Sequence, residues 1–532
     1  MIKTIYLFLA YFLFFSATAV AQSDKGNVSG SFQTDFQYYL RDNRINAIPP
    51  PEKIGLNSYL KLDYRFNQFS TGLRYEHYAP PLLGYPTNFQ GTGIANRYLT
   101  YQSDGLEVTA GNFYEQFGSG MSFRAQEQRQ LGIDNSVDGM RVRYSFKDKA
   151  RLTGFAGKQR DGFEKSEGTV RGIDGEVYLH HILPIDSATL SDWHITLGGS
   201  MVSRFQPYSG TLNNVPTQTE LYAARITVNK GDFTLYSEYV SKGEDPSAMN
   251  KYVSNKGSAA LLNLGYTYKN VGINLAAKRI ENMDTRSDRR AIANRLWVNY
   301  IPANTTQHTY RLLTLYPYAA QTVGETAVQA DISYNVKKGS LLGGKYGVEI
   351  NLNYALARSV DSTQFFALGK RSYFQDSNIE VIKKISKDFK MTAKYVFLQY
   401  DKDQIEGTTG FGLIKSHTIV LDMLYKIGRK KSLRMELQHL GTNQDFGAWM
   451  MGMLEYSLAP KWFFYVFDEI NYNGLRVGVP IHYYNAGAAF VKNANRFSIN
   501  VGRQRAGLVC VGGICRIVPA SSGVTLSITS SF

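Results

Sequence analysis

The segment Gly-Val-Thr-Leu-Ser-Ile-Thr-Ser-Ser-Phe, residues 523–532, decides the fold. One parity of this segment is apolar and consists of Val524, Leu526, Ile528 and Phe532. The other parity carries hydroxyl groups, on Thr525, Ser527, Thr529 and Ser531, and Ser530 interrupts the apolar row once. Because a β-strand points successive side chains to opposite faces, the pattern predicts a strand with one apolar and one polar face that stops on an aromatic residue.

The same two-faced pattern recurs from residue 27 onward. In residues 57–66, for example, Leu60 and Leu62 share one face and Lys61 and Asp63 share the other. The connection Asn67-Gln68 that follows is so short that only an antiparallel hairpin can form. Segments of this kind number roughly 24, with a range of about 22 to 26 because boundaries drift when they are read from sequence.

Short and long connections alternate along the chain. Tight turns at 67–68, 147–149 and 269–270 alternate with long segments such as 79–93 and 281–324. Turns at one end and long loops at the other are the layout of an outer-membrane barrel. We therefore predict an all-β fold, a transmembrane antiparallel up-and-down β-barrel, with residues 22–532 as a single domain. A soluble solenoid or multi-domain sandwich is the alternative, but neither repeats nor domain linkers are visible.

The N-terminus predicts export. Residues 1–21 are typical of a signal peptide, with Lys3, an apolar run at 5–15 and the small-residue site Ala19-Val20-Ala21. An N-terminal membrane anchor is the alternative, which the shortness of the run disfavours. We expect no transmembrane helix, no plug domain of the energy-coupled kind ahead of the first strand, and a location in the cell outer membrane.

The charge balance does not favour nucleic acid as a partner. Lys plus Arg is 59 and Asp plus Glu is 44, a net charge of +15. A soluble basic protein would suggest nucleic-acid binding, but here the charges occupy the polar parity, the turns and the loops. Arg279 and Lys383 fall on the apolar parity near strand ends, where a charge costs little.

The two cysteines predict a small covalent loop. They lie in Cys510-Val-Gly-Gly-Ile-Cys515, where the glycines allow a tight reversal. An exported chain meets an oxidising compartment, so we expect a disulfide, with two free thiols as the alternative.

Two long segments are candidates for filling the lumen, because wall side chains alone do not fill a barrel of this size. In the first segment, 112–140, opposite charges alternate, and two arginines on the lumen parity follow; the candidates are Glu115, Arg124, Glu127, Arg129, Asp134, Asp138, Arg141 and Arg143. The second, 281–324, carries Asp284, Arg286, Asp288, Arg289, Arg290, His308, Arg311, Glu325 and the tyrosines Tyr310, Tyr316 and Tyr318 in or beside it. We expect both to fold inward and to be held by ion pairs to the wall; solvated surface loops are the alternative.

Motifs for catalysis and cofactors are missing from the sequence. It contains no Gly-x-Ser-x-Gly, His-Glu-x-x-His or phosphate-loop pattern. The adjacent pair His180-His181 falls in a predicted strand, which would point the two rings to opposite faces. We therefore expect no catalytic residues, no cofactor, no metal and no enzyme activity.

Three stretches resemble an uncharacterised family of Bacteroidota outer-membrane barrels. They are Ala110 to Val142, Val28 to Tyr39, and Asn299 to Tyr310. The resemblance covers most of the mature chain and implies location and fold, with no activity to transfer. The terminal strand ending in Phe532 also resembles the closing strand that the barrel-assembly machinery reads. Partners implied are that machinery, outer-membrane lipid, lipopolysaccharide and, as further candidates, other envelope proteins.

Two functions follow as expectations. The first is a porin-like channel or uptake barrel for polar or anionic solutes. The second is a non-catalytic barrel subunit of a larger Bacteroidota envelope complex for secretion, nutrient uptake or outer-membrane assembly.

Overall fold

The computed structural model describes residues 26–182, 192–211, 214–361, 363–365, 367–473, 478–511 and 514–532, so the predicted signal peptide lies outside the described residues. The described residues form a closed barrel of 24 antiparallel strands, which confirms the predicted fold class. The barrel strands are β1 (Asn27–Leu40), β2 (Ile54–Phe66), β3 (Phe69–Tyr78), β4 (Gly91–Ser103), β5 (Leu106–Phe113), β10 (Val137–Phe146), β11 (Ala150–Asp161), β13 (Thr169–Tyr178), β14 (Trp193–Phe205), β15 (Gln218–Lys230), β16 (Phe233–Lys242), β17 (Gly257–Tyr268), β18 (Val271–Glu281), β19 (Gly324–Val336), β20 (Val348–Val360), β21 (Leu368–Lys384), β22 (Phe389–Asp401), β23 (Leu413–Lys426), β24 (Lys431–Gly441), β25 (Trp449–Leu458), β26 (Trp462–Asn471), β27 (Ile481–Lys492), β28 (Asn495–Gln504) and β31 (Ser521–Ser531).

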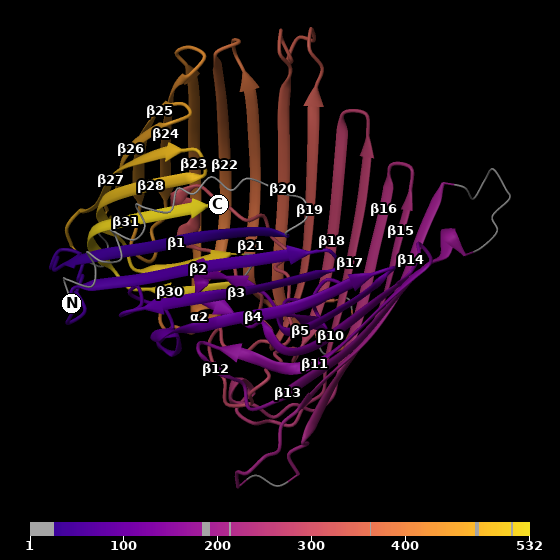
Figure 1. Ribbon diagram of the computed structural model, residues 1–532. Helices are drawn as coiled ribbons and strands as arrows, with labels where there is room; N and C mark the ends of the chain where they lie inside the picture. The colour runs from indigo at the N-terminus through magenta and orange to yellow at the C-terminus, as the bar shows by residue number, and fades with distance from the viewer. Residues whose placement is uncertain are drawn as a thin grey trace.

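The barrel closes where its first and last strands meet (Figure 1). β1 pairs with β2 on one side and with β31 on the other, so that Phe36 lies opposite Leu526. Phe532 extends this seam, because its backbone exchanges hydrogen bonds of 2.8 and 3.0 Å with Gly30. The Phe532 ring covers the face of Gly30 so closely that a Cβ there would come within 2.5 Å of it. The seam therefore uses a glycine to make room for the terminal aromatic ring.

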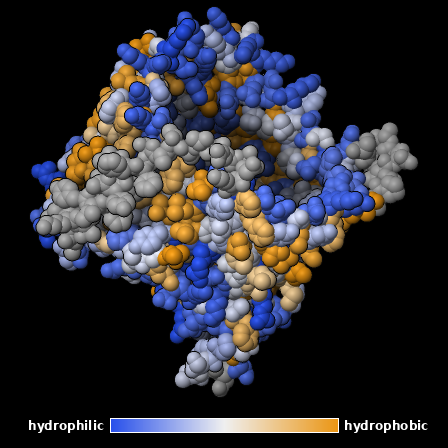
Figure 2. Space-filling view, viewed as in Figure 1, coloured by the Kyte–Doolittle hydropathy of each residue, from blue (hydrophilic) through white to orange (hydrophobic). Residues whose placement is uncertain are grey.

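Strand parity separates the two faces of the wall, as the sequence pattern predicts. In β20, Leu352 and Tyr354 are about two-fifths exposed on the outer surface, whereas Asn353, Ala355 and Ala357 are buried on the inner one. Apolar residues accordingly colour much of the outer surface in Figure 2. Removing apolar surface from water lowers the free energy by about 25 cal/mol per Å². A lipid bilayer around the barrel would provide this stabilisation for the outward-facing side chains.

Smaller elements lie almost entirely in the long loops. They are η1 (Thr87–Phe89), β6 (Gln116–Phe117), β7 (Phe123–Arg124), β8 (Glu127–Gln128), η2 (Arg129–Leu131), β9 (Ile133–Asp134), β12 (Glu164–Lys165), η4 (Ala248–Asn250), η5 (Arg311–Leu315), α2 (Lys402–Glu406), β29 (Gly507–Val511) and β30 (Ile514–Val518). On the opposite side, where the short turns lie, η3 (Leu179–His181) is the exception. Among the described helices, none combines the length and apolar character needed to cross a bilayer.

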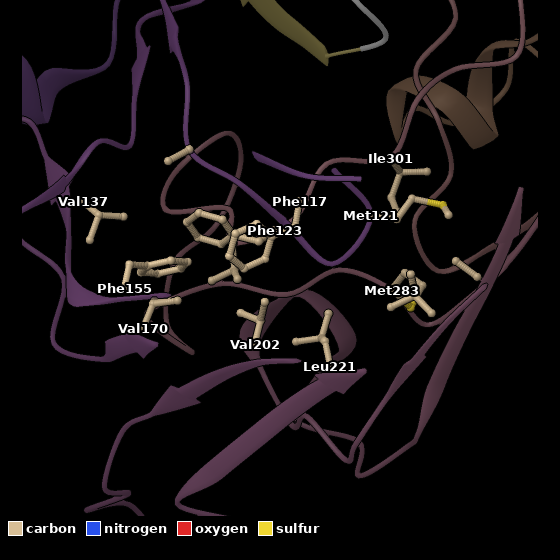
Figure 3. Packing of buried hydrophobic residues seen from close by; sticks show 14 of the residues in the cluster. Phe117, Met121, Phe123, Val137, Phe155, Val170, Val202, Leu221, Met283 and Ile301 are labelled. Atoms are coloured by element: carbon tan, nitrogen blue, oxygen red, sulfur yellow. The ribbon is translucent and has the colours of Figure 1, made fainter. Parts of the chain in front are cut away.

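Two long loops fold into the lumen, which confirms the predicted inward packing. We call residues 114–136 the first plug loop and residues 282–323 the second. Phe117 and Phe123 of the first loop pack on Phe155 of the wall, with the Phe123 and Phe155 ring centroids 4.4 Å apart (Figure 3). Met283 and Ile301 of the second loop belong to the same cluster. A fully buried side chain of this size contributes about 1.5–3 kcal/mol, so the loops are packed as a core.

A second apolar cluster fixes the end of the second plug loop. The loop contributes Leu312, Leu313, Tyr316 and Tyr318, and the wall contributes residues of β19 to β25. Tyr318 stacks on Phe374 with the ring centroids 4.6 Å apart. The second loop therefore contacts both halves of the wall.

Candidate functional site

Glu115 ties the first plug loop to the inner wall. Its carboxylate lies 2.6 Å from Arg143 and 3.2 Å from Arg141, both on β10. Arg141 also pairs with Glu107 of β5. The site candidates Glu115, Arg141 and Arg143 thus come together, and the loop is joined to the wall through charge-assisted hydrogen bonds.

Asp134 is the centre of a buried charge cluster at the other end of this loop. It pairs with Arg74 of β3 and Arg160 of β11, which are both 4% exposed, and these arginines also share Glu76. Burial alone would raise the pKa of Asp134, but Arg160 and Arg74 outweigh it and hold the pKa below its usual value. The tyrosine Tyr114 donates a further hydrogen bond to Asp134, of 3.0 Å.

The other charged candidates of the first loop act in different ways. Glu127 lies 2.6 Å from Arg129 and 3.0 Å from Arg74. Arg129 also stacks on Tyr59 of the wall, 4.3 Å from the ring centroid. Arg124 stacks on Tyr300 of the second plug loop, at 4.2 Å, instead of pairing with a wall carboxylate. The two plug loops are therefore joined to one another as well as to the wall.

Asp138 is the candidate that lies outside the lumen. It shares strand parity with Met140 and Val142, whose side chains are exposed on the outer surface. Its carboxylate lies 2.7 Å from Lys165 and 3.7 Å from the exposed Arg97. The expected lumen position is corrected here, because two residues of one parity cannot face opposite sides of the sheet.

The second plug loop is pinned across the lumen by polar contacts to the wall. His308 lies 2.6 Å from Asp376, and Arg311 pairs with Glu469. The hydroxyl of Tyr310 donates to Asp422 at 3.3 Å, that of Tyr316 to Asp445 at 3.2 Å, and that of Tyr318 to Glu325. Contacts from several strands between β19 and β26 thus hold a single segment.

The remaining charged candidates make contacts in the first part of the second plug loop. Arg286 lies 2.8 Å from Asp284 and stacks on Trp297. Arg290 pairs with Glu167, and Asp288 accepts a hydrogen bond of 3.1 Å from Gln206. Burial and the nearby Arg204 lower the pKa of Arg289 to about 10.

Arg279 lies on β18, on the apolar parity. It donates to the backbone carbonyl of Phe365 and pairs with Glu281, so its charge is compensated at the strand end.

A third inward element was not predicted. The hairpin β29–β30, joined by the Cys510–Cys515 disulfide, packs through Ile514 on Leu131 and Ile133 of the first plug loop. We call residues 507–518 the disulfide hairpin. Its apolar run, Leu-Val-Cys-Val before the glycines and Ile-Cys-Arg-Ile-Val after them, was the available signal, because a loop this apolar needs to be buried.

Three cavities follow one another through the lumen. An outer cavity of about 470 Å³ reaches Asn46 on the loop side and a central cavity has about 530 Å³. These two share Arg505, Gly507 and Leu508 as a common wall. An inner cavity of about 370 Å³, lined by Asn274 and other residues near the turns, shares Thr306 with the central one. Viewed as in Figure 1, the barrel mouth appears as a hollow with a hydrophilic rim (Figure 2).

The central cavity is basic. His308, Arg311, Arg503 and Arg505 line it, and among its described lining residues there is no Asp or Glu. Glu469 does not line the cavity but lies fully buried beneath its lining residues. Its carboxylate lies 2.8 Å from Arg505 and also pairs with Arg311, so two guanidinium groups share one carboxylate. Burial lowers the pKa of Arg505, opposed by Glu469. The local charge therefore favours an anion over a cation.

Histidines and carboxylates do not form an open metal centre in the described residues. Glu76, Glu127 and Asp134 bring donor atoms within 4.8 Å of one another, but three arginines already pair with them: Arg74 with all three, Arg160 with Glu76 and Asp134, and Arg129 with Glu127. The strand predicted over His180-His181 ends earlier, and in η3 the two rings pack 4.0 Å apart instead of facing opposite ways.

Comparisons with known proteins agree with the fold. A model of a family of unknown function, DUF6029, matches residues 1–532. No curated protein is similar in sequence. The chain is similar to one in the cryo-EM structure of the E. coli P pilus tip assembly intermediate PapC-PapD-PapK-PapG, with a TM-score of 0.50 and 9% identity over 97% of this chain and 62% of that chain.

Two further structures are similar at lower TM-scores. One is the siderophore receptor PirA from Pseudomonas aeruginosa, with a TM-score of 0.43 and 7% identity over 96% of this chain and 81% of that chain. The other is a BenF-like porin from Pseudomonas fluorescens Pf-5, with a TM-score of 0.37 and 10% identity over 78% of this chain and 98% of that chain. At these identities the likeness concerns the fold, that of a large outer-membrane-type barrel.

Proposed function

The chain belongs to the family of unknown function DUF6029, and we propose that it is an outer-membrane channel or uptake barrel for small polar or anionic solutes. The observation that supports this most directly is the succession of outer, central and inner cavities, each sharing a wall with the next. Each is within the size of a pocket that holds a small metabolite. A solute would pass from one to the next where the shared walls yield.

The central cavity supplies the preference for anions. Arg311 and Arg505 share the single carboxylate of Glu469, which leaves a net positive charge at the wall between the outer and central cavities. Charged groups with low-dielectric walls raise the local concentration of counter-ions. A carboxylate or phosphate solute would therefore collect there, whereas a cation would be repelled.

The route into the membrane is part of the proposal. We infer that a Bacteroidota cell exports the chain by the signal peptide at residues 1–21. The assembly machinery would read the terminal strand ending in Phe532, and the outer surface would contact lipid and lipopolysaccharide. We expect no enzyme activity in the finished barrel.

Planar-bilayer recording tests the channel. The wild-type barrel should give a small conductance with a reversal potential that indicates anion preference. Deletion of residues 508–517 should enlarge the conductance, because it removes the disulfide hairpin while Gly507 and Val518, which face each other in register, keep the ends adjacent. A wild-type barrel and a deletion variant that are both silent would contradict the proposal.

A matched pair of substitutions tests the anion preference. Arg311→Gln removes a lumenal charge, and we expect the anion-to-cation permeability ratio to fall. Arg496→Gln removes the same charge from the exposed turn-side end of β28, and the ratio should stay unchanged. Equal shifts in the two variants would show that the Arg311 site does not set selectivity.

The alternative is a non-catalytic barrel subunit of a larger envelope complex for secretion, nutrient uptake or outer-membrane assembly. It is favoured by the apolar cores on both plug loops, which give the lumen the packing of a structural interior. Purification from native membranes in mild detergent tests it, since a stable complex would retain its partner while an isolated channel would emerge alone.

A further inference from the structure

We propose that one side of the turn-side rim is a docking surface for an acidic periplasmic protein. The surface, which we call the basic arc, comprises four turns with flanking residues, 337–347, 383–390, 426–431 and 459–461. Its cationic residues are Lys337, Lys338, Lys345, Lys383, Lys384, Lys387, Lys390, Lys426, Arg429, Lys430, Lys431 and Lys461. The one carboxylate in these ranges is Asp388. This proposal rests on the proposed membrane orientation, in which the short turns face the periplasm. It does not depend on whether solutes pass through the barrel.

The four turns are neighbours in the wall. Strands β19 to β26 pair in sequence, each with the next, so their hairpin turns lie side by side along one edge. This edge stands at the top of Figure 1, and the same edge is strongly hydrophilic in Figure 2. Other turns carry fewer basic residues: Asn67–Gln68 and Asp104–Gly105 have none, and Lys147-Asp148-Lys149 and Lys230-Gly231-Asp232 combine lysine with a carboxylate.

The charge of the arc is uncompensated, unlike that of the lumen. Among the described residues, none of its twelve cations has a carboxylate within 4.0 Å, and all except the partly buried Lys383 are exposed. In the lumen, by contrast, Arg74, Arg141 and Arg311 are all paired. Like charges held together on a rim repel one another, so the arrangement is unfavourable unless an opposite charge approaches.

An apolar tip projects from the same arc. Leu341 is 101% exposed and Leu342 is 71% exposed, at the end of the β19–β20 turn. These adjacent exposed leucines are flanked in the turn by Lys337, Lys338 and Lys345, which resembles an interface with an apolar contact and a polar rim. The tip would enter an apolar recess of the partner while the lysines contact its carboxylates.

The distribution of charge favours a protein over lipid headgroups. Lipid surrounds a barrel on all sides, so a requirement to bind anionic lipid would place lysines at every turn. Lysines at the other turns, such as Lys147, Lys230 and Lys269, number only one or two per turn, whereas the arc gathers twelve cations and one carboxylate on one side. Lys345, Lys387 and Lys430 lie in the turns themselves, beyond the ends of the strands. A partner with a localised acidic face and an apolar recess fits this surface.

A binding assay with charge-reversal variants tests the docking surface. The barrel is placed in phosphatidylcholine nanodiscs, and a labelled poly-glutamate peptide serves as the probe. The variant Lys337→Glu/Lys387→Glu/Arg429→Glu/Lys430→Glu should bind at least about tenfold more weakly, and wild-type binding should fall with salt. The control, Lys147→Glu/Lys149→Glu/Lys230→Glu/Lys269→Glu, changes the net charge equally at other turns and should bind like the wild type. Equal losses in both variants would overturn the arc as a localised site.

Crosslinking in cells separates a protein from lipid. A photo-crosslinking amino acid at Leu341 should yield one defined protein adduct in intact cells, and the arc variant should lose it while the control variant keeps it. Both variants should remain heat-modifiable barrels on gels, because all eight positions are exposed. Binding of phosphatidylglycerol vesicles that the arc variant alone loses, without any protein adduct, would overturn the proposal in favour of lipid.

Discussion

Removal of the Asp134 charge should release the first plug loop without unfolding the barrel. Asp134→Asn keeps the size of the side chain but leaves Arg74 and Arg160 buried with one carboxylate fewer. Removing one partner of a buried ion pair costs about 3–5 kcal/mol. Both arginines keep Glu76, so we expect the lower end, about 3 kcal/mol. That value corresponds to an increase of roughly 150-fold in the open population of the loop.

Trypsin digestion of outer-membrane vesicles measures this opening. The loop contains Arg124 and Arg129 as cleavage sites, and cleavage follows the equilibrium population of the open form when reclosing is fast. The control is Asp138→Asn, the same substitution four residues further on at the outer face, where Asp138 pairs with the half-exposed Lys165 and an ion pair near the surface contributes only about 0–1 kcal/mol. Cleavage of the two variants at the same rate, with the barrel intact, would refute the assignment of Asp134 as the anchor.

Three further outcomes follow from the same contacts. In the folded protein the pKa of Asp134 is below its usual value of 3.8. The stability that its carboxylate gives to the closed loop is therefore complete above pH 3.8 and is lost as the pH falls through the lower folded pKa, so the loop should stay trypsin-resistant at pH 5. Glu469→Gln leaves Arg505 without its buried carboxylate, so the current recorded in bilayers should become larger or noisier, whereas a current identical to wild type would contradict the pinning role. Replacing Cys510 and Cys515 by serine should weaken the hairpin by about 2 kcal/mol, seen as faster hydrogen exchange of its amides, and unchanged exchange would show that packing alone holds it.

The barrel could be predicted from sequence because its signal is local. Parity needs only neighbouring residues, as in Leu60 against Lys61, and the tight turn at Asn67–Gln68 needs only the two strands beside it. The inward folding of the loops also followed from sequence, since a wide lumen must be filled. Strand parity could also have predicted the position of Asp138, because Asp138 has the same parity as Met140, which faces the outer surface.

The pairing partners inside the lumen could not be predicted, because they depend on three-dimensional closure. Asp134 and Arg74 are 60 residues apart in the chain, and Arg311 and Glu469 are 158 residues apart. The sequence around one residue of each pair does not indicate which residue is its partner. The disulfide loop itself was predicted, but its inward position was missed for the same reason. Its Ile514 is buried by Leu131, which belongs to a loop near the other end of the chain.

The seam between β1 and β31 can form only when both ends of the strand series are present. Ser31 cannot meet Ser531 until almost the whole polypeptide has been delivered, so the ring is completed by its final strand. Until then both borders of the growing sheet offer unpaired backbone groups to any neighbouring chain. The pairing of β31 with β1 closes the cylinder and at the same time removes the two open edges through which the sheet could aggregate.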